Sequence, residues 1–257
     1  MGIAMTMPSD RTRRLSGLVL AVALLAAAEA LPAPAEDHAA RRREMVAEIR
    51  AMPPEDPRDA LRTFAPRVLA VLERVPRHEF VPPPQRPHAY ENRPLAIGHG
   101  QTISQPYIVS LMTDLLRLKP GDRVLEVGTG SGYQAAVLAE LVREVYTIEI
   151  VEPLARQAKE RLARLGYRNV EVRAGDGYQG WEAHAPFDAI MVTAGASQVP
   201  PRLLQQLKPG GLRVIPVGEA DAVQELTLIE KRADGSTRSR RIVPVRFVPL
   251  TGGPGGP

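Results

Sequence analysis

Cysteine is absent from this chain of 257 residues, which excludes disulfides, thiolate zinc sites and a cysteine nucleophile. The absence does not fix the compartment, because a chain without thiols tolerates oxidising and reducing surroundings alike. Aromatic residues are also scarce, at 4%, and none stands among the arginines of the basic clusters at residues 41–43 and 238–241. Proteins that bind single-stranded nucleic acid stack bases on aromatic side chains. We therefore expect no nucleic-acid partner and interpret the net charge of +4 as a targeting segment plus solvated basic surfaces.

The chain also lacks an apolar run long enough to cross a bilayer. Residues 15–28 are largely apolar but fall short of the ~20 residues that a spanning helix needs. Three arginines precede this run within residues 11–14, and an Ala-Pro-Ala sequence follows it at residues 33–35. Basic residues, a short apolar run and a small-residue cleavage site are typical of an export signal. Residues 1–35 are thus predicted to target the chain to the periplasm, with an uncleaved extension on a cytoplasmic protein as the alternative.

The remainder of the chain is predicted to form a single α/β domain at residues 36–251. We divide it into an N-terminal helical and loop region (36–104), a core of alternating strands and helices (105–218) and C-terminal strands (219–251). Residues 252–257 are predicted to be a flexible tail, since they consist only of glycine and proline.

Hydrophobic periodicity and the positions of proline and glycine predict the individual elements. Helices are expected at 36–51, 57–74 (broken or kinked at Pro66), 105–117, 132–142, 152–165 and 199–207. Strands are expected at 123–128, 145–150, 170–173, 187–193, 212–217, 224–231 and 242–248, the last two flanking a turn at Asp234-Gly235. Residues 81–84 are predicted to be an extended linker and residues 90–105 an ordered loop. The alternation predicts a parallel, doubly wound sheet with an antiparallel pair at its end.

A glycine-rich segment at residues 124–132, Val-Leu-Glu-Val-Gly-Thr-Gly-Ser-Gly, joins a predicted strand to a predicted helix. Glycines allow a sharp turn and a close approach of the backbone to a ligand. A phosphate-binding P-loop would need Gly-Lys-Ser/Thr, which is missing, and a dinucleotide site would need its third glycine at Tyr133 instead of Gly132. The pattern Glu-x-Gly-x-Gly-x-Gly instead resembles the first motif of class I S-adenosylmethionine-dependent methyltransferases.

Two acidic residues at the ends of later strands fit an adenosyl ligand. Glu149 ends the next strand after the glycine loop, where a carboxylate can accept both ribose hydroxyls. Asp176-Gly177 follows the third strand and is placed to reach an adenine. Each also has an ordinary reading, Glu149 as a solvated acid at a strand end and Asp176-Gly177 as a plain turn.

The segment Gly-Gln-Thr-Ile-Ser-Gln-Pro at residues 100–106 completes a set of motifs similar to those of the protein-L-isoaspartate O-methyltransferases. The other motifs lie, in chain order, at residues 75–81, 89–90, 95–98, 175–181, 185–188, 207–211, 215–218 and 245–250. The resemblance covers about residues 40–251, and it is specific because separate motifs occur in order with sensible spacing. The N-terminal extension departs from the family pattern, and His99 stands where the family varies.

The resemblance implies a seven-stranded methyltransferase sheet with an added N-terminal helical region, S-adenosylmethionine as the cofactor and no metal. It implies that Ser104 is the active-site serine and that Thr102, Ile103 and Gln105 line the acceptor pocket. The strand edge at Ile215, Pro216 and Val217 is expected to bind an extended peptide. The expected cofactor residues are Glu126, Gly128, Thr129, Gly130, Gly132, Glu149, Asp176 and Gly177.

The activity that the resemblance implies is methylation of the free carboxylate of L-isoaspartyl residues in damaged proteins, which starts repair through a succinimide. This acceptor is ionised at neutral pH, because its pKa is about 3.9, so the reaction needs no general base. We expect a monomer whose partners are damaged proteins and peptides. A methyltransferase with another small-molecule or protein acceptor is the alternative activity, and a peptide-binding or nucleic-acid-binding module without turnover is the alternative class.

Overall fold

A computed structural model describes residue 1 and residues 37–52, 63–219 and 222–253. Residues 38–257 form one compact unit, separate from residues 1–37. The predicted export signal, the first part of the predicted helix at 57–74 and most of the predicted tail lie outside the described residues.

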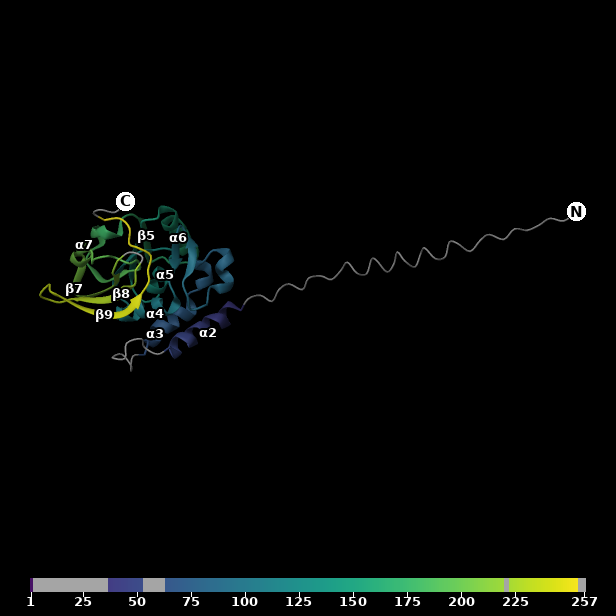
Figure 1. The fold of residues 1–257 in the computed structure, drawn as a ribbon, viewed down its shortest axis with the longest axis horizontal. Helices are drawn as coiled ribbons and strands as arrows, with labels where there is room; N and C mark the ends of the chain where they lie inside the picture. Colours follow the sequence, from purple (N-terminus) through teal and green to yellow (C-terminus); the bar gives the residue numbers. More distant parts are fainter. Residues whose placement is uncertain (2–36, 53–62, 220–221, 254–257) are drawn as a thin grey trace. The chain divides into compact units, whose positions relative to one another are not determined.

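A seven-stranded sheet forms the centre of the domain, flanked by helices (Figure 1). Its strands run in the order β5 (Val170–Ala174), β4 (Glu144–Glu149), β3 (Arg123–Val127), β6 (Phe187–Val192), β7 (Leu207–Val217), β8 (Gln224–Lys231) and β9 (Thr237–Val245). The strands from β5 to β7 are parallel, whereas β8 is antiparallel to both of its neighbours. The predicted α/β class and the predicted antiparallel pair at the end are confirmed, and the sheet as a whole is mixed.

Ten helical segments accompany the sheet within the described part of the chain. The α-helices are α2 (His38–Ala51), α3 (Pro66–Arg74), α4 (Pro106–Leu115), α5 (Tyr133–Ala139), α6 (Glu152–Arg164) and α7 (Pro201–Gln205). The short 3₁₀ segments are η2 (Arg77–Phe80), η3 (Pro83–His88), η4 (Gly177–Gln179) and η5 (Glu182–His184).

Side chains on the parallel strands alternate between two cores, one on each face of the sheet. On β6, Ala189 and Met191 join the larger core, and Ile190 and Val192 join the smaller one. Helices α2 to α6 contribute to the larger core, and α7 and the segment around Trp181 cover the other face. Helices α2, α3 and α4 pack against one another (Figure 1), so the N-terminal helices are part of this domain.

Several elements differ from the prediction for identifiable reasons. Pro66 does not break a helix but occupies the first turn of α3, where its missing N–H costs nothing. Residues 83–88 form the 3₁₀ segment η3, although the prolines there favoured an extended linker. The predicted loop at 90–105 contains the antiparallel hairpin of β1 (Leu95–Gly98) and β2 (Gln101–Ile103), whose short strands leave little periodicity to detect. Strand β7 begins at Leu207, with an irregularity that displaces residues 208–211 from the ladder.

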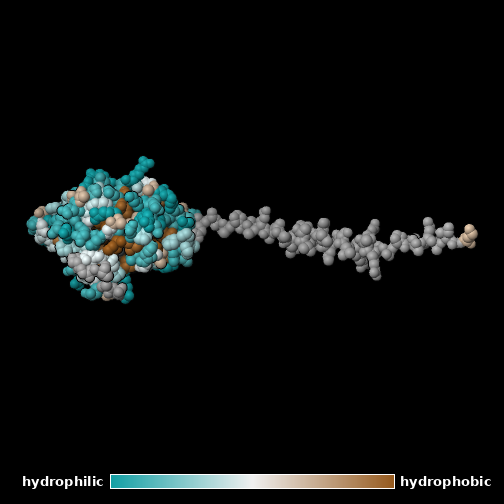
Figure 2. All heavy atoms as spheres, turned by 90° about the horizontal axis from the view of Figure 1, so that it is seen from above, coloured by the Kyte–Doolittle hydropathy of each residue, from teal (hydrophilic) through white to brown (hydrophobic). Residues whose placement is uncertain are grey.

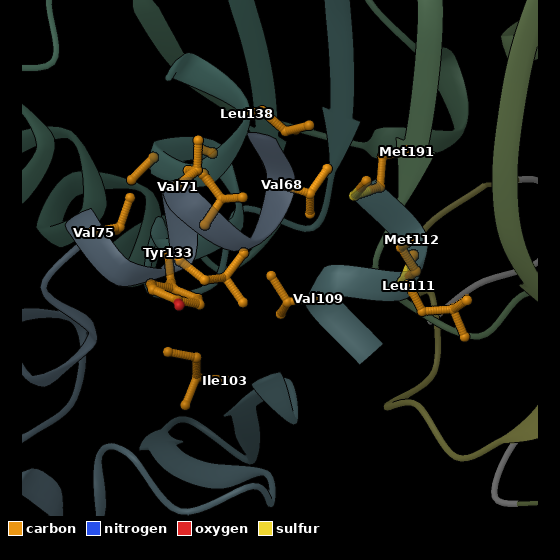
Figure 3. Close-up of a cluster of buried hydrophobic side chains, with 14 of the residues drawn as sticks. Val68, Val71, Val75, Ile103, Val109, Leu111, Met112, Tyr133, Leu138 and Met191 are labelled. Carbon is orange, nitrogen blue, oxygen red and sulfur yellow. The ribbon is translucent and has the colours of Figure 1, made fainter. Parts of the chain in front are cut away.

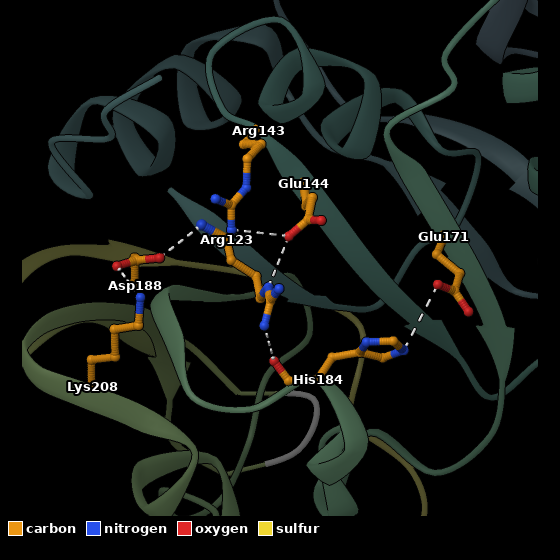
Figure 4. Close-up of polar contacts among 7 residues, drawn as sticks. All are labelled: Arg123, Arg143, Glu144, Glu171, His184, Asp188 and Lys208. Carbon is orange, nitrogen blue, oxygen red and sulfur yellow. Dashed lines mark hydrogen bonds and ion pairs between the residues drawn. The ribbon is translucent and has the colours of Figure 1, made fainter. Parts of the chain in front are cut away.

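A polar network ties together the amino-terminal ends of the parallel strands (Figure 4). The Arg123 guanidinium donates to Glu144 Oε2 at 2.9 Å and to the His184 carbonyl at 3.1 Å. Asp188 accepts from the Arg123 backbone N–H at 2.8 Å and from Lys208 Nζ at 2.7 Å. These contacts connect β3, β4, β6 and β7 at their amino-terminal ends. The carboxyl ends of the strands, on the opposite side of the sheet, are available for a ligand site.

The face shown in Figure 2 is mostly hydrophilic, but apolar side chains gather in its middle, where hydrophilic groups surround them. No helix among the described residues is long and apolar enough to cross a membrane.

Candidate functional site

A cleft lies at the carboxyl ends of β3, β4 and β6, where ligands bind in open α/β sheets. Its walls come from five segments, at residues 101–104, 127–134 (without Gly132), 148–151, 193–194 and 248–251, together with Gly177 and Val109. The cleft thus combines residues from all three parts into which the sequence divides the domain. The C-terminal wall and the pair Thr193-Ala194 are absent from the predicted site.

The glycine loop turns directly after β3 and is fastened from both sides. The Gly128 N–H donates to the Ile148 carbonyl at 2.8 Å, and the Thr193 hydroxyl donates to the Gly128 carbonyl at 2.6 Å. Gly128 has a φ of 99°, and a Cβ atom there would lie 2.4 Å from Thr193 Oγ1. Only glycine fits this position, and the loop backbone is thereby exposed to the cleft.

Glu149 is the predicted acid whose placement best fits an adenosyl ligand. Its side chain is only 6% exposed, and it lines the cleft at the end of β4. One carboxylate oxygen accepts the Gly130 N–H at 2.7 Å, and the other accepts the Val151 N–H at 2.9 Å. A carboxylate oxygen has two lone pairs, so each can still accept a hydroxyl. The residues present therefore fit the ribose of S-adenosylmethionine.

Glu126, by contrast, does not line the cleft. It is fully buried beneath the loop, where Oε2 accepts from the Thr147 hydroxyl at 2.6 Å. Thr147 in turn shares a 2.6 Å hydrogen bond with Thr129, a residue of the loop itself. Burial raises the pKa of Glu126 to about 8, the charge of Glu149 adds to this effect, and the Thr147 hydrogen bond opposes it. The structure assigns Glu126 a supporting position behind the loop.

This buried carboxyl predicts a specific pH dependence of stability. The folded pKa of about 8 exceeds the ordinary value of 4.5, so between these values the folded protein holds a proton that the unfolded chain releases. Stability should then fall as pH rises through this window, by at most ~1.4 kcal/mol per pH unit. Glu126→Gln cannot titrate at this position. The difference in free energy of unfolding between this variant and the wild type should therefore shift in favour of the variant as the pH rises from about 5.5 to about 7.5. Urea unfolding of both proteins measures this, and a constant difference across that range would contradict it.

The remaining predicted cofactor residues occupy different positions. Thr129, Gly130 and Gly177 line the cleft, whereas Gly132 lies at the N-terminal end of α5 with a φ of 87° and is not part of the wall. Asp176 is also outside the wall, because its carboxylate accepts the Tyr178 N–H at 2.8 Å and the Gly253 N–H at 3.0 Å. In this conformation Asp176 holds the C-terminal segment beside the cleft.

The predicted acceptor segment reaches the same cleft from the other side. Thr102, Ile103 and Ser104 line it, while Gln105 directly precedes α4, and its carbonyl accepts the Val109 N–H at 3.0 Å. The segment is fixed from behind by Arg77, whose Nη2 donates to the Ser104 carbonyl at 2.8 Å. A methyl donor and an acceptor can therefore meet in one cleft.

The predicted peptide-binding edge is not open in this structure. Ile215, Pro216 and Val217 pair with residues 225–227 of β8 on one side. On the other side, the Ala196 N–H donates to the Pro216 carbonyl at 3.0 Å, and Ile215 is fully buried. Because the C-terminal strands return to cover β7, a peptide cannot add here as a further strand, and the expected contact with an extended peptide stays a prediction.

A seven-stranded mixed sheet with a glycine loop after β3 and a cleft-facing carboxylate after β4 is typical of S-adenosylmethionine-dependent methyltransferases of class I. Comparison with known proteins narrows this class. The sequence pattern of the protein-L-isoaspartate(D-aspartate) O-methyltransferase family matches residues 59–255, and the chain belongs to this family.

Individual relatives agree with this assignment. The chain is 59% identical over 241 residues to protein-L-isoaspartate O-methyltransferase 1 of Cupriavidus necator, covering 93% of each protein. It is 69% identical over 186 residues to protein-L-isoaspartate O-methyltransferase 2 of a Polaromonas species, covering 72% of this chain and 88% of that protein.

Solved structures are similar as well. A protein-L-isoaspartate O-methyltransferase superposes with a TM-score of 0.71 at 28% identity, over 82% of this chain and 66% of that one. A Plasmodium falciparum protein described as a possible member of the family, in complex with S-adenosylhomocysteine, gives 0.68 at 27% identity, over 83% of this chain and 98% of that one.

Two groups of cleft residues far from the predicted loops were absent from the predicted site. Thr193 and Ala194 directly follow β6, and the rule that ligands bind at the carboxyl ends of neighbouring parallel strands would have pointed to them. Residues 248–251 follow the last strand, and the motif at residues 245–250 was the signal that could have pointed to them. Among the residues that the structure describes, no group of three histidine, aspartate or glutamate side chains is arranged to hold a metal ion.

Proposed function

We propose that this protein transfers a methyl group from S-adenosylmethionine to the free carboxylate of L-isoaspartyl residues in damaged proteins. The observation that carries the proposal is the single cleft lined both by the glycine loop with Glu149 and by residues 102–104. Family membership supports the same reaction. The methyl ester that forms can expel methoxide, which a carboxylate cannot, so the neighbouring peptide nitrogen can attack the ester carbonyl and close a succinimide with release of methanol. Hydrolysis of this ring returns part of the material to normal aspartate.

The chain's own residues have to bind the cofactor, orient the acceptor and exclude water. S-adenosylmethionine supplies a methyl group on a sulfonium, and the acceptor with a pKa of about 3.9 is already ionised at neutral pH. Glu149 is placed to hold the ribose, and the glycine loop lets the backbone approach the ligand. Alignment of the acceptor oxygen with the methyl carbon and sulfur supplies much of the rate enhancement, because such ordering contributes several kcal/mol.

In this proposal the hydroxyl of Ser104, which lines the cleft, orients the acceptor carboxylate through a hydrogen bond. A hydrogen bond to a charged group contributes about 1.5–3 kcal/mol. Ser104→Ala is therefore expected to lower kcat/KM for an isoaspartyl peptide by about 10- to 100-fold. The affinity for S-adenosylhomocysteine should stay within about 2-fold, since the serine lies on the acceptor side of the cleft.

Ser110→Ala provides a matched control. Ser110 is a buried serine of α4 whose hydroxyl donates to the Pro106 carbonyl at 2.9 Å, and it is not part of the cleft wall. Steady-state methylation and calorimetric titration compare the two variants. The role assigned to Ser104 would be wrong if Ser104→Ala lost cofactor affinity and kept wild-type turnover at saturating cofactor.

The reaction itself is tested with two synthetic peptides that differ only in isoaspartate or aspartate at one position. The protein is expected to transfer base-labile label from methyl-labelled S-adenosylmethionine to the isoaspartyl peptide alone. Binding of the cofactor without label on either peptide would replace this proposal with a methyltransferase acting on another acceptor.

We also propose, from the sequence alone, that the protein acts as a monomer and that residues 1–35 direct its export. The cytoplasmic synthesis of S-adenosylmethionine argues for the alternative, a cytoplasmic enzyme. The mass of the N-terminal peptide of protein recovered from the periplasm tests for cleavage before Glu36.

A further inference from the structure

Arg77 is a fully buried arginine that joins three segments behind the acceptor side of the cleft. Its Nε donates to the Ala89 carbonyl at 2.8 Å, and its Nη2 donates to the Ser104 carbonyl at 2.8 Å. The guanidinium carbon lies 4.8 Å from the centre of the Tyr133 ring. Both Ser104 and Tyr133 line the cleft, so the guanidinium lies directly behind its wall.

Tyr133 is itself held firmly in place. Its side chain is 1% exposed and lies among apolar groups that include Ile103 and Val109 (Figure 3). The ring of Phe80 packs against its edge, with the ring centres 5.5 Å apart. The guanidinium of Arg77 is therefore held between the packed ring of Tyr133 on one side and the Ser104 carbonyl on the other.

The charge of Arg77 is not balanced by an acidic side chain. Among the described residues no carboxylate forms an ion pair with it, and its Nη1 and the Tyr133 hydroxyl make no hydrogen bond. Burial lowers the pKa of Arg77 to about 10, and neighbouring Tyr133 opposes this effect, so the group stays charged at neutral pH. A buried cation without a counter-ion costs several kcal/mol.

Bridging two carbonyls requires hydrogen-bond donors but no net charge. An anion that enters the cleft next to Ser104 would supply the counter-ion that the folded protein lacks. In a water-poor cleft, charges a few ångströms apart attract one another much more strongly than in bulk water.

We propose that Arg77 is a positioning residue for the acceptor carboxylate: it fixes the backbone of Ser104 and attracts the isoaspartyl anion from behind the cleft wall. This inference rests on the proposed function. It explains why a cation is buried at this wall, and it gives the cleft a preference for an ionised acceptor.

The test compares wild type, Arg77→Met and Arg77→Lys in two assays. The first measures KM and kcat for an isoaspartyl peptide. The second measures inhibition by that peptide's neutral isoasparaginyl analogue, whose affinity does not depend on a charge. Arg77→Met is expected to raise KM at least ~10-fold and to abolish the preference for the carboxylate peptide over the amide, while S-adenosylhomocysteine still binds within about 3-fold. Arg77→Lys keeps the charge and should retain part of the preference.

Arg213→Met is the matched control. Arg213 is also fully buried, its Nε and Nη2 have no hydrogen-bond partner, and burial lowers its pKa to about 10. Its Nη1, however, donates to the carbonyl of Pro200, which is not part of the cleft wall. We expect its peptide KM and its carboxylate preference to match the wild type. An equal change in both Met variants would overturn the proposal, since it would show a general effect of losing a buried charge.

The other outcomes also decide between the hypotheses. If the wild type transfers the methyl group normally and Arg77→Met keeps the wild-type KM and the preference for the carboxylate peptide, the inference about Arg77 is overturned and the proposed function stands. If Arg77→Met does not bind S-adenosylhomocysteine, the KM and the carboxylate preference of Arg77→Lys decide instead. If neither variant binds S-adenosylhomocysteine, Arg77 supports the whole fold and the proposal is overturned. Absence of transfer by a cofactor-binding wild type would overturn the proposed function.

Discussion

Glu149→Gln is expected to weaken the binding of S-adenosylhomocysteine at least ~100-fold. The carboxylate accepts one backbone N–H on each oxygen, from Gly130 at 2.7 Å and from Val151 at 2.9 Å, and is almost fully buried. A glutamine has one acceptor oxygen and one NH₂ group, so one of these N–H donors would face another donor. The change would displace the glycine loop and also remove an acceptor for the ribose hydroxyls.

Isothermal titration calorimetry measures this effect, and Glu152→Gln is its control. Glu152 begins α6 only three residues later, but its side chain is 76% exposed and its contact with Arg156 at 3.9 Å is a weak surface pair. We expect this variant to bind like the wild type. Equal affinities for all three proteins would show that Glu149 does not hold the cofactor.

Gly128→Ala is expected to cost about 3 kcal/mol or more of folding free energy and to abolish measurable binding of S-adenosylhomocysteine. Two separate penalties act at this position. A φ of 99° is strained for any residue with a side chain, and the added Cβ atom would lie 2.4 Å from Thr193 Oγ1. Relief of that contact would break the hydrogen bonds that Thr193 makes to the carbonyls of Val127 and Gly128.

Gly121→Ala separates these penalties from the general effect of replacing a glycine. A Cβ atom at Gly121 meets nothing within 4 Å, and its backbone has no unusual φ. We expect its urea midpoint to be unchanged or slightly higher, because alanine has less conformational freedom than glycine in the unfolded chain. A Gly128→Ala protein with a midpoint equal to that of Gly121→Ala would contradict the proposed tightness of the loop.

The parts of the fold that follow a local rule were predictable from the sequence. The alternation of apolar strands and amphipathic helices after Gly121 predicted the central sheet, because each element has to bury its apolar face. The hairpin of β1 and β2 escaped prediction, because its strands of four and three residues are too short to display a period. Pro66 was misjudged for a related reason, since a proline at a helix start and a proline within a helix look alike in sequence.

The sequence by itself determined the alternation of strands and helices after Gly121, the glycine loop and the acid at the end of β4. Each of these depends on a short stretch of residues whose backbone or side-chain requirements are local. The family resemblance indicated the segment around Ser104, and this segment does line the cleft. Only the tertiary structure decided that Glu126 is buried behind the loop, that β8 covers the edge of β7, and that residues 248–251 close the cleft. It also brought Arg77 to the carbonyl of Ser104, 27 residues away in the chain. Burial and long-range contact depend on how distant segments pack together, and no local pattern encodes that packing.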